Sequence, residues 1–298
     1  HNRASVNGGA IAHRTGSLTA RNLYLEDNDS DFGGGIYSAA SLTLADSSLQ
    51  NNFADEFGGG LYLAAGQATV ANSAFRANDV YNANSTALLV NTLIAGNALS
   101  GLVNESFATL QNTTIAGNFT RNVPAAGIDN TSGTLNLINS VVYGNRSDKG
   151  LASDIRNTAT LNMRASLYGS LDDTGTFNDN GDNTQSNLAP AQVFVDYDVP
   201  INFSITSGDF RLSPLNTTDA AIGTADATQL ATEQSINFDY DGDTVIRANT
   251  TLPDLDGAPR VFGDPDRGAY ERQEPTVIIQ QFDVTNDHVV SGDRKSVV

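Results

Sequence analysis

The stretches Gly33-Gly34-Gly35-Ile36-Tyr37 and Gly58-Gly59-Gly60-Leu61-Tyr62 decide the fold of this chain, together with Gly8-Gly9-Ala10-Ile11 before them. The three clusters begin 25 residues apart, so they mark successive copies of one unit. A repeat of this length is typical of a solenoid, in which each unit packs only against its neighbours.

An 11-residue frame follows each glycine cluster and continues after the clusters have ended. It has apolar residues at its third and eighth positions, Asn at its fifth and last, and Ser or Thr at its sixth. Copies of the frame begin near Leu18, Leu42, Ala68, Ala87, Ala108, Leu135 and Leu161. We expect two apolar columns to stack into a continuous core: Ala20, Leu44, Val70, Leu89, Leu110, Leu137 and Met163, and Leu25, Leu49, Phe75, Ile94, Ile115, Val142 and Tyr168.

The pattern inside each unit favours strands over helices. Short alternating runs such as Ser41-Leu42-Thr43-Leu44 are broken by Gly, Asn and Asp, which leaves no room for the helical stripe of a leucine-rich repeat. The sequence therefore predicts an all-β fold, a right-handed parallel β-helix. Residues 1–170 form its coils, 171–272 a C-terminal β-helix or capping region, and 273–298 a tail, linker or subunit-pairing segment.

Two columns of asparagine run through the frame. We expect them to form a structural ladder, because Asn tolerates the left-handed backbone region and can bond to its neighbours above and below. The fifth position supplies Asn22, Asn72, Asn91, Asn112 and Asn139, with Asp46 in the second copy. The last position supplies Asn28, Asn52, Asn78, Asn97, Asn118 and Asn145.

Composition limits the classes of partner. Sixteen basic and thirty-four acidic residues give a net charge of -18, so nucleic acid and anionic membranes are poor partners. The chain has no cysteine and no apolar run long enough to span a membrane. Since it begins at His1 without a signal peptide, we expect it to be a processed or truncated piece of a larger protein.

Sequons for N-glycosylation are about twice as frequent as the composition predicts. They would suit an external polar solenoid and make this a glycoprotein, although turn chemistry also favours Asn, Ser and Thr. The candidate acceptors are Asn28, Asn84, Asn104, Asn112, Asn118, Asn130, Asn145, Asn202, Asn216 and Asn249.

Candidate chemistry is sparse. Asp239, Asp241 and Asp243 have the spacing of a calcium loop, although no closing glutamate follows, and they could equally form a polar turn. Ca²⁺ is thus the one candidate cofactor. Tyr37 and Tyr62, one unit apart, could form an aromatic strip for sugar stacking or a packed ladder. No residues stand out as a catalytic group.

Two groups of motifs resemble known families. Glycine-rich starts followed by segments such as Asn112 to Asn118 resemble polymorphic outer-membrane-protein repeats of bacterial surface β-helix proteins. Asp209 to Pro214, Asp254 to Arg260 and Asp266 to Glu271 resemble the end of the choice-of-anchor Q group, except that Arg267 replaces a usually apolar residue. The resemblance implies a secreted or cell-surface protein.

We therefore expect a secreted or cell-surface structural or adhesive protein, an adhesin or extracellular filament subunit that assembles end to end. Exposed strand edges at both ends of a solenoid allow such pairing. The alternative is a carbohydrate-active enzyme, a lyase or glycoside hydrolase, or a glycan-binding module acting on acidic polysaccharide. That alternative depends on analogy with the fold.

Overall fold

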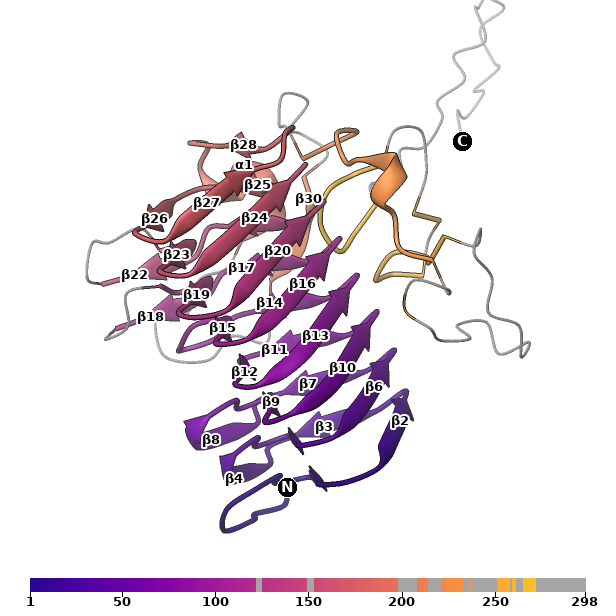
Figure 1. Cartoon of the computed structure of the whole chain (residues 1–298). Helices are drawn as coiled ribbons and strands as arrows, with labels where there is room; N and C mark the ends of the chain where they lie inside the picture. Colours follow the sequence, from indigo (N-terminus) through magenta and orange to yellow (C-terminus); the bar gives the residue numbers. More distant parts are fainter. Residues whose placement is uncertain are drawn as a thin grey trace, which may run out of the picture.

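A computed structural model gives the arrangement of most of the chain. It describes residues 1–121, 125–148, 153–197, 208–213, 221–232, 236, 251–257, 259–260 and 265–271. Almost every regular element in these residues is a short strand, and the strands form a stacked solenoid (Figure 1). The predicted all-β parallel β-helix is confirmed.

Three eight-stranded parallel sheets form the walls of the solenoid. The first contains β1 (Ile11–His13), β5 (Ile36–Ser38), β9 (Leu61–Leu63), β12 (Val80–Asn82), β15 (Leu102–Asn104), β19 (Ile128–Asn130), β23 (Ile155–Asn157) and β26 (Leu171–Asp173). The second contains β2 (Ser17–Arg21), β6 (Ser41–Ala45), β10 (Gly66–Ala71), β13 (Ser85–Val90), β16 (Phe107–Gln111), β20 (Thr134–Ile138), β24 (Thr160–Arg164) and β27 (Thr176–Asp179). The third contains β3 (Tyr24–Glu26), β7 (Ser48–Gln50), β11 (Ala74–Arg76), β14 (Leu93–Ala95), β17 (Thr114–Ala116), β21 (Val141–Tyr143), β25 (Leu167–Tyr168) and β28 (Thr184–Gln185).

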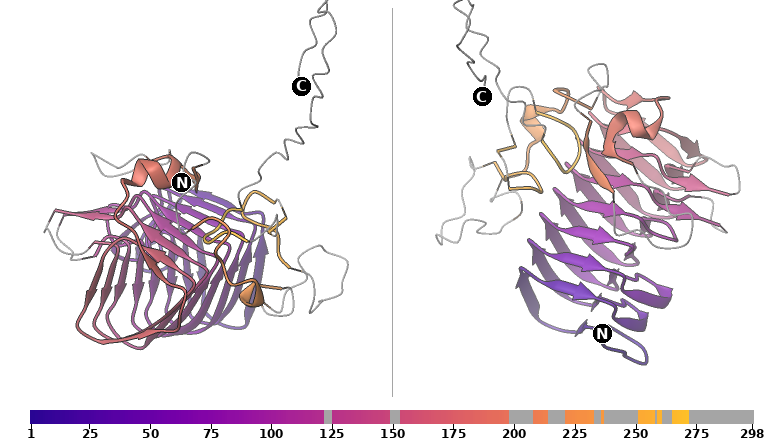
Figure 2. Two further views of the ribbon diagram at one scale, coloured as in Figure 1. Left: turned by 90° about the horizontal axis from the view of Figure 1, so that it is seen from above. Right: turned by 180° about the vertical axis from the view of Figure 1, so that it is seen from behind.

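The register of the second sheet agrees with the sequence frame residue for residue. Leu18, Leu42, Ala68, Ala87, Ala108, Leu135 and Leu161, the predicted starts of the frame, are paired in that order. Both predicted apolar columns line one hydrophobic core. Viewed from above, the strands of successive coils lie over one another, as this register requires (Figure 2, left).

Two further pairs of strands lie beside the main sheets. β4 (Asp29–Phe32) pairs with β8 (Phe53–Phe57), and β18 (Phe119–Thr120) pairs with β22 (Arg146–Ser147). They occupy the longer connections that follow the third sheet in those coils.

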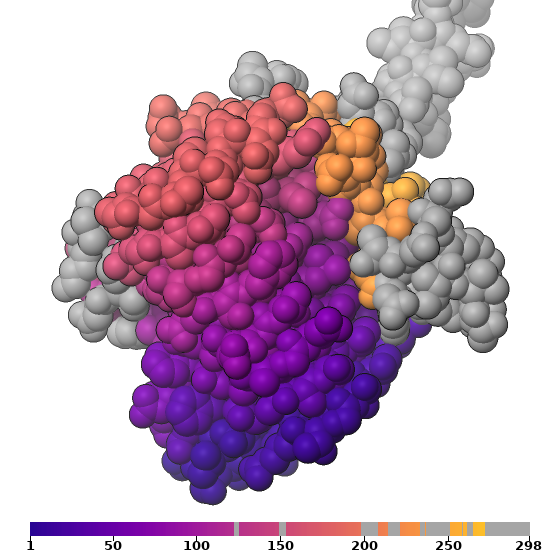
Figure 3. Space-filling view, in the orientation of Figure 1, coloured from indigo at the N-terminus to yellow at the C-terminus, as the bar shows by residue number. Residues whose placement is uncertain are grey.

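The described C-terminal segments lie along the flank of the solenoid (Figure 2 and Figure 3, orange and yellow). They include α1 (Pro190–Val193), β29 (Phe194–Asp196), β30 (Asp209–Leu212) and the 3-10 turn Ala227–Gln229. Their apolar side chains Phe194, Phe210 and Tyr270 cover outward residues of the third sheet, among them Leu93 and Val141. The flank therefore buries a second core outside the coils.

The two ends of the coil stack differ. In the first coil the inward side chains Ile11, Leu18, Leu23 and Leu25 are only partly buried. In the last coil Asp179 stands at the inward position of the Met163 column, so this end carries a polar residue where the inner coils carry apolar ones. Within the part of the chain that the structure describes, no helix is long and apolar enough to cross a membrane.

Candidate functional site

The asparagines at the last frame position form a ladder of side-chain hydrogen bonds along the coil axis. Asn28 Nδ2 donates to Asn52 Oδ1 at 2.7 Å, and Asn52 Nδ2 donates to Asn78 Oδ1 at 2.7 Å. Further along, each Nδ2 donates to the next Oδ1 in the series Asn97, Asn118 and Asn145, again at 2.7 Å. These buried amides thereby satisfy one another, as buried polar groups require.

This ladder is interrupted between Asn78 and Asn97. The amide of Asn78 turns back and donates to the carbonyl oxygen of Arg76 at 3.0 Å. Asn97 is 2% exposed, and its Oδ1 has no hydrogen-bond partner among the residues that the structure describes. The orientation of its amide is fixed, because its Nδ2 and its backbone N–H both point to Asn118 Oδ1. A buried acceptor is therefore left open at the break.

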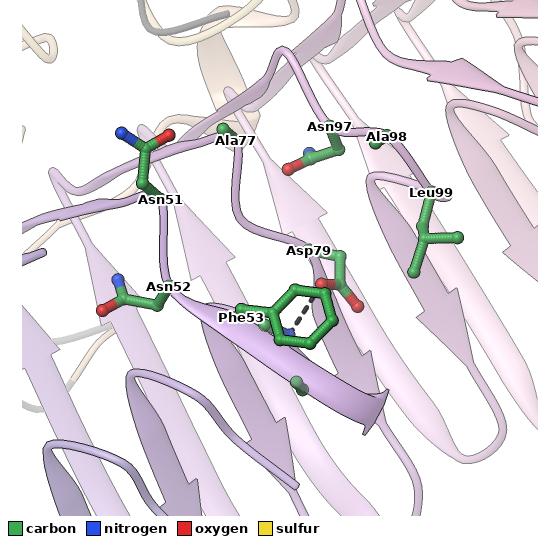
Figure 4. A pocket seen from close by; sticks show the side chains of 10 residues that line it. Asn51, Asn52, Phe53, Ala77, Asp79, Asn97, Ala98 and Leu99 are labelled. Carbon is green, nitrogen blue, oxygen red and sulfur yellow. Dashed lines mark hydrogen bonds between the residues drawn. The ribbon is translucent and has the colours of Figure 1, made fainter. Parts of the chain in front are cut away.

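A pocket of about 360 Å³ opens at this break (Figure 4). Two acceptor groups face it, the Oδ1 of Asn97 and the carboxylate of Asp79. The full lining is Asn51, Asn52, Phe53, Ala54, Gly59, Ala77, Asp79, Asn97, Ala98 and Leu99. The side chains come from three successive coils, so the coil stack itself sets their spacing.

The Asp79 carboxylate is held by the glycine cluster of its neighbouring coil. Gly59 N donates to it at 2.6 Å and Gly58 N at 3.1 Å. Burial raises the pKa of Asp79, and the two glycine N–H bonds oppose that rise only in part. A Cβ at Gly59 would lie 2.8 Å from Asp79 Oδ1, so glycine is needed for the carboxylate to approach the backbone.

The rim of the pocket is apolar and accessible. Phe53 is 60% exposed and Leu99 is 48% exposed, although both are large hydrophobic residues. Ala54, Ala77 and Ala98 add small apolar surface between them. The pocket thus combines open acceptors inside with an exposed aromatic side chain at its edge, an arrangement suited to binding a small organic group.

Tyr37 and Tyr62 are placed one above the other, as their spacing predicts, and Tyr81 extends the stack. The ring centroids of Tyr37 and Tyr62 are 5.6 Å apart with planes 8° apart, and those of Tyr62 and Tyr81 are 5.4 Å apart at 18°. Phe32 packs against Tyr62 at 5.3 Å. Because Tyr62 lies between two other tyrosines, this geometry favours a packed ladder over a platform for sugar stacking.

The fifth-position asparagines have a different role from the last-position ones. Asn22, Asn72, Asn91, Asn112 and Asn139 have φ between 46° and 53°, in the left-handed region. In the other column, the left-handed residue is the one before the asparagine, for example Asp27, Asn51 and Ala77. The fifth-position column therefore turns the backbone and also forms a rung from Asn91 Nδ2 to Asn72 Oδ1 at 3.0 Å, whereas the last-position column carries the longer side-chain ladder.

The C-terminal motif residues build a buried polar network against the coils. Arg260, 3% exposed, donates to the carbonyl oxygens of Gly268 and Ala269 at 2.9 and 2.8 Å. Its guanidinium also donates to Asn91 Oδ1 at 2.8 Å. Burial lowers the pKa of Arg260 to about 10, and the nearby carboxylates, led by that of Asp254, oppose this. The motif thus fixes the flank to Asn91, a coil residue whose backbone is in the left-handed region.

Arg267, the departure from the resembled motif, also holds the flank. It is 3% exposed and donates to Thr184 Oγ1 at 3.2 Å and to the Asp182 carbonyl oxygen. Both acceptors belong to the last coil, so a charged residue at this position links the flank to the end of the stack. The same guanidinium also donates to the Thr224 carbonyl oxygen at 3.3 Å.

The predicted glycosylation sites fall into three groups. Of the sequons in the described residues, only Asn84 has an exposed side chain. The others have buried amides at 5% exposure or less: Asn28, Asn104, Asn112, Asn118, Asn130 and Asn145. Asn202, Asn216 and Asn249 lie outside the described residues. Glycosylation stays a prediction, and the accessible acceptor in the coils is Asn84.

The predicted calcium loop cannot be located. Asp239, Asp241 and Asp243 lie outside the described residues, as does the segment 273–298. In the described ranges, no group of three or more His, Cys, Asp and Glu side chains gathers in the manner of a metal site.

A third asparagine ladder was missed by sequence reasoning. The Nδ2 atoms of Asn82, Asn104 and Asn130 each donate to the next Oδ1, at 2.9, 2.8 and 2.6 Å, and Asn157 ends the series by donating to Asp173 at 2.7 Å. The sequence does contain a pattern that predicts this ladder. Four strands of the first sheet, β12, β15, β19 and β23, each consist of an apolar residue, a variable residue and an asparagine, in that order.

Comparison with protein-family models, with curated proteins and with solved structures finds no match for this chain.

Proposed function

We propose that the protein is a secreted or cell-surface structural and adhesive β-helix that assembles end to end. The observation that carries this proposal is the difference in charge between the first two strands and the last coil of the stack. β1, β2 and the turn between them contain Arg14 and Arg21 and no acidic residue, whereas the same coil ends with Glu26 and Asp27. Because Arg21 already pairs with Asp46 of the next coil, Arg14 supplies the positive charge that this proposal uses, in a chain whose net charge is -18.

The opposite end is acidic. Residues 171–185, which form the last coil, contain Asp172, Asp173, Asp179 and Asp182 and no Lys or Arg. Placing the first coil of one copy on the last coil of another would bring opposite charges together and cover the partly exposed Leu18 and its inward neighbours. Complementary charge favours such encounters and fixes their direction.

Backbone pairing would support the same joint. In the described residues, β1, β2 and β3 pair with another strand on one side only, as do β26, β27 and β28. Such open edges are templates for pairing with another chain. Within the stack, Arg21 pairs with Asp46 of the next coil at 2.9 Å, and a joint between copies would use ion pairs of the same kind.

Charge reversal at one end tests the assembly. We expect the sedimentation coefficient of the wild type to rise with protein concentration at low salt and to rise less at high salt. Arg14→Glu, in the exposed turn between β1 and β2, should weaken association. Arg146→Glu is the charge-matched control, because it makes the same charge change at an exposed position on β22, outside the first and last coils. A monomer at every concentration would overturn the assembly proposal.

The extracellular setting in this proposal is supported by the resemblance to polymorphic outer-membrane-protein repeats and to the choice-of-anchor Q group. Trypsin shaving of intact source cells, followed by detection of peptides from the coils, tests it. Peptides released only after lysis would contradict the surface location.

A second candidate function is glycan binding, with or without catalysis on a polysaccharide. The pocket at the ladder break favours it, because Asp79 and the exposed Phe53 line this pocket and the buried Asn97 Oδ1 lacks a donor among the described residues.

A further inference from the structure

The pocket at the ladder break contains more hydrogen-bond acceptors than the protein satisfies. Asn97 Oδ1 is buried without a donor, whereas its equivalents in neighbouring coils each receive an amide N–H. An unsatisfied buried acceptor destabilises the fold, so a group that donates a hydrogen bond there would be bound favourably. The carboxylate of Asp79 lies in the same pocket and adds a charged acceptor.

The rest of the pocket restricts what that donor can be. A bare cation or an ammonium group would use the acceptors but would leave Phe53 and Leu99 exposed to water. A hexose ring satisfies both requirements, because its hydroxyls donate to separate acceptors and its C–H face packs on an aromatic ring. The volume of about 360 Å³ lies in the lower part of the range of about 300–1,000 Å³ typical of small-molecule sites.

Charge restricts the sugar further. The lining contains the Asp79 carboxylate and no basic residue, and the whole chain carries a net charge of -18. An acidic sugar would meet repulsion both locally and at long range. The complementary ligand is therefore an uncharged sugar.

We propose that the pocket between Asp79, Asn97, Phe53 and Leu99 binds one hexose unit of a neutral glycan. Asn97 Oδ1 and the Asp79 carboxylate accept sugar hydroxyls, and the Phe53 ring packs against the sugar face. This inference gives a ligand class to the adhesive part of the proposed function. It depends on the pocket alone and is independent of assembly.

Saturation-transfer NMR and titration calorimetry on the full chain test the proposal. The probes are neutral hexasaccharides: β-1,4-glucan, β-1,3-glucan, α-mannan and β-galactan. Hexamers of galacturonate and of glucosamine are the charged comparisons. Every probe is tested with and without EDTA. We expect at least one neutral hexasaccharide to bind, with EDTA having no effect.

Phe53→Ala should weaken that binding about tenfold, equivalent to about 1.4 kcal/mol. Its matched control is Phe107→Ala, since Phe107 is also exposed, at 43%, but lies on the second sheet away from the pocket lining. The circular dichroism spectrum and thermal midpoint of both variants should match the wild type, because both side chains face solvent.

Three results would overturn the proposal: no binding of any neutral hexasaccharide at millimolar concentration, equal binding by Phe53→Ala and wild type, or binding limited to a charged hexamer. Sedimentation of Arg14→Glu reports on assembly separately, so failure of the pocket and failure of the assembly proposal are distinguishable.

Discussion

Asp154 gives the fold a pH dependence that can be worked out from its position at the end of the last-position ladder. It is 5% exposed, and its Oδ1 accepts from the backbone N–H and the Nδ2 of Asn145 at 2.8 and 2.9 Å. Its Oδ2 accepts from Ser170 N and Oγ at 3.0 and 3.2 Å. Burial outweighs these four donors and raises the pKa of Asp154 to about 6.

The sign follows from comparing folded and unfolded chains. Below about pH 3 the carboxyl is protonated in both states and makes no difference to the free energy of unfolding. As the pH rises from 3 to 6, the unfolded chain loses its proton first, so the folded state is progressively destabilised. With a pKa of about 6 when folded against a model value of 3.8, the loss amounts to about 3 kcal/mol and is complete above pH 7.

Asp154→Asn isolates this contribution, because asparagine is neutral at every pH. The unfolding free energies of wild type and variant should be measured by urea denaturation, followed by circular dichroism, between pH 3 and pH 7.5. Their difference should shift by about 3 kcal/mol in favour of the variant over this range. The carboxyl ¹³C resonance of Asp154 should titrate near pH 6, and higher in Ser170→Ala. A pH-independent difference would refute the reasoning.

Three other substitutions test the core, the flank and the pocket. Phe75→Ala, at a fully buried position, should lower the unfolding free energy by about 3–5 kcal/mol in urea denaturation. Arg260→Ala should leave the Gly268 carbonyl oxygen and Asn91 Oδ1 unpaired at about 1–3 kcal/mol each, since the Ala269 carbonyl oxygen still accepts from Leu255 N, and hydrogen exchange should rise at residues 265–271 while the inner coils stay protected. Gly59→Ala should displace both Asp79 and the backbone at Asn52, since its Cβ would lie 2.8 Å from Asp79 Oδ1 and 2.7 Å from the Asn52 carbonyl oxygen, and should reduce hexasaccharide binding as strongly as Phe53→Ala.

The coils could be predicted from the sequence because their contacts repeat. Each inward residue meets its equivalent in the next unit, so the columns that contain Leu44 and Phe75 follow from the spacing of apolar residues along the chain. The flank has no such regularity. Arg260 donates a hydrogen bond to Asn91, 169 residues away in the sequence, and no repeating pattern in the sequence predicts that contact. Similarly, Asp154 continues a ladder of asparagines only 9 residues after Asn145, where the frame predicts no rung.

The pocket arises where the repeat changes length. Asn52 and Asn78 are 26 residues apart, whereas the next step in the same column, from Asn78 to Asn97, takes 19, because the fourth unit lacks the glycine cluster and its lateral strand. β8 therefore has no successor in the next coil, Phe53 remains exposed at the step, and the ladder misses one hydrogen bond. The sequence contains this shortening, but spacing alone does not tell whether a ladder re-forms across it. The amide of Asn78 could donate to Asn97 Oδ1 only if the pocket between them closed. The missing hydrogen bond in the ladder and the pocket that a ligand can enter are therefore one feature of the fold.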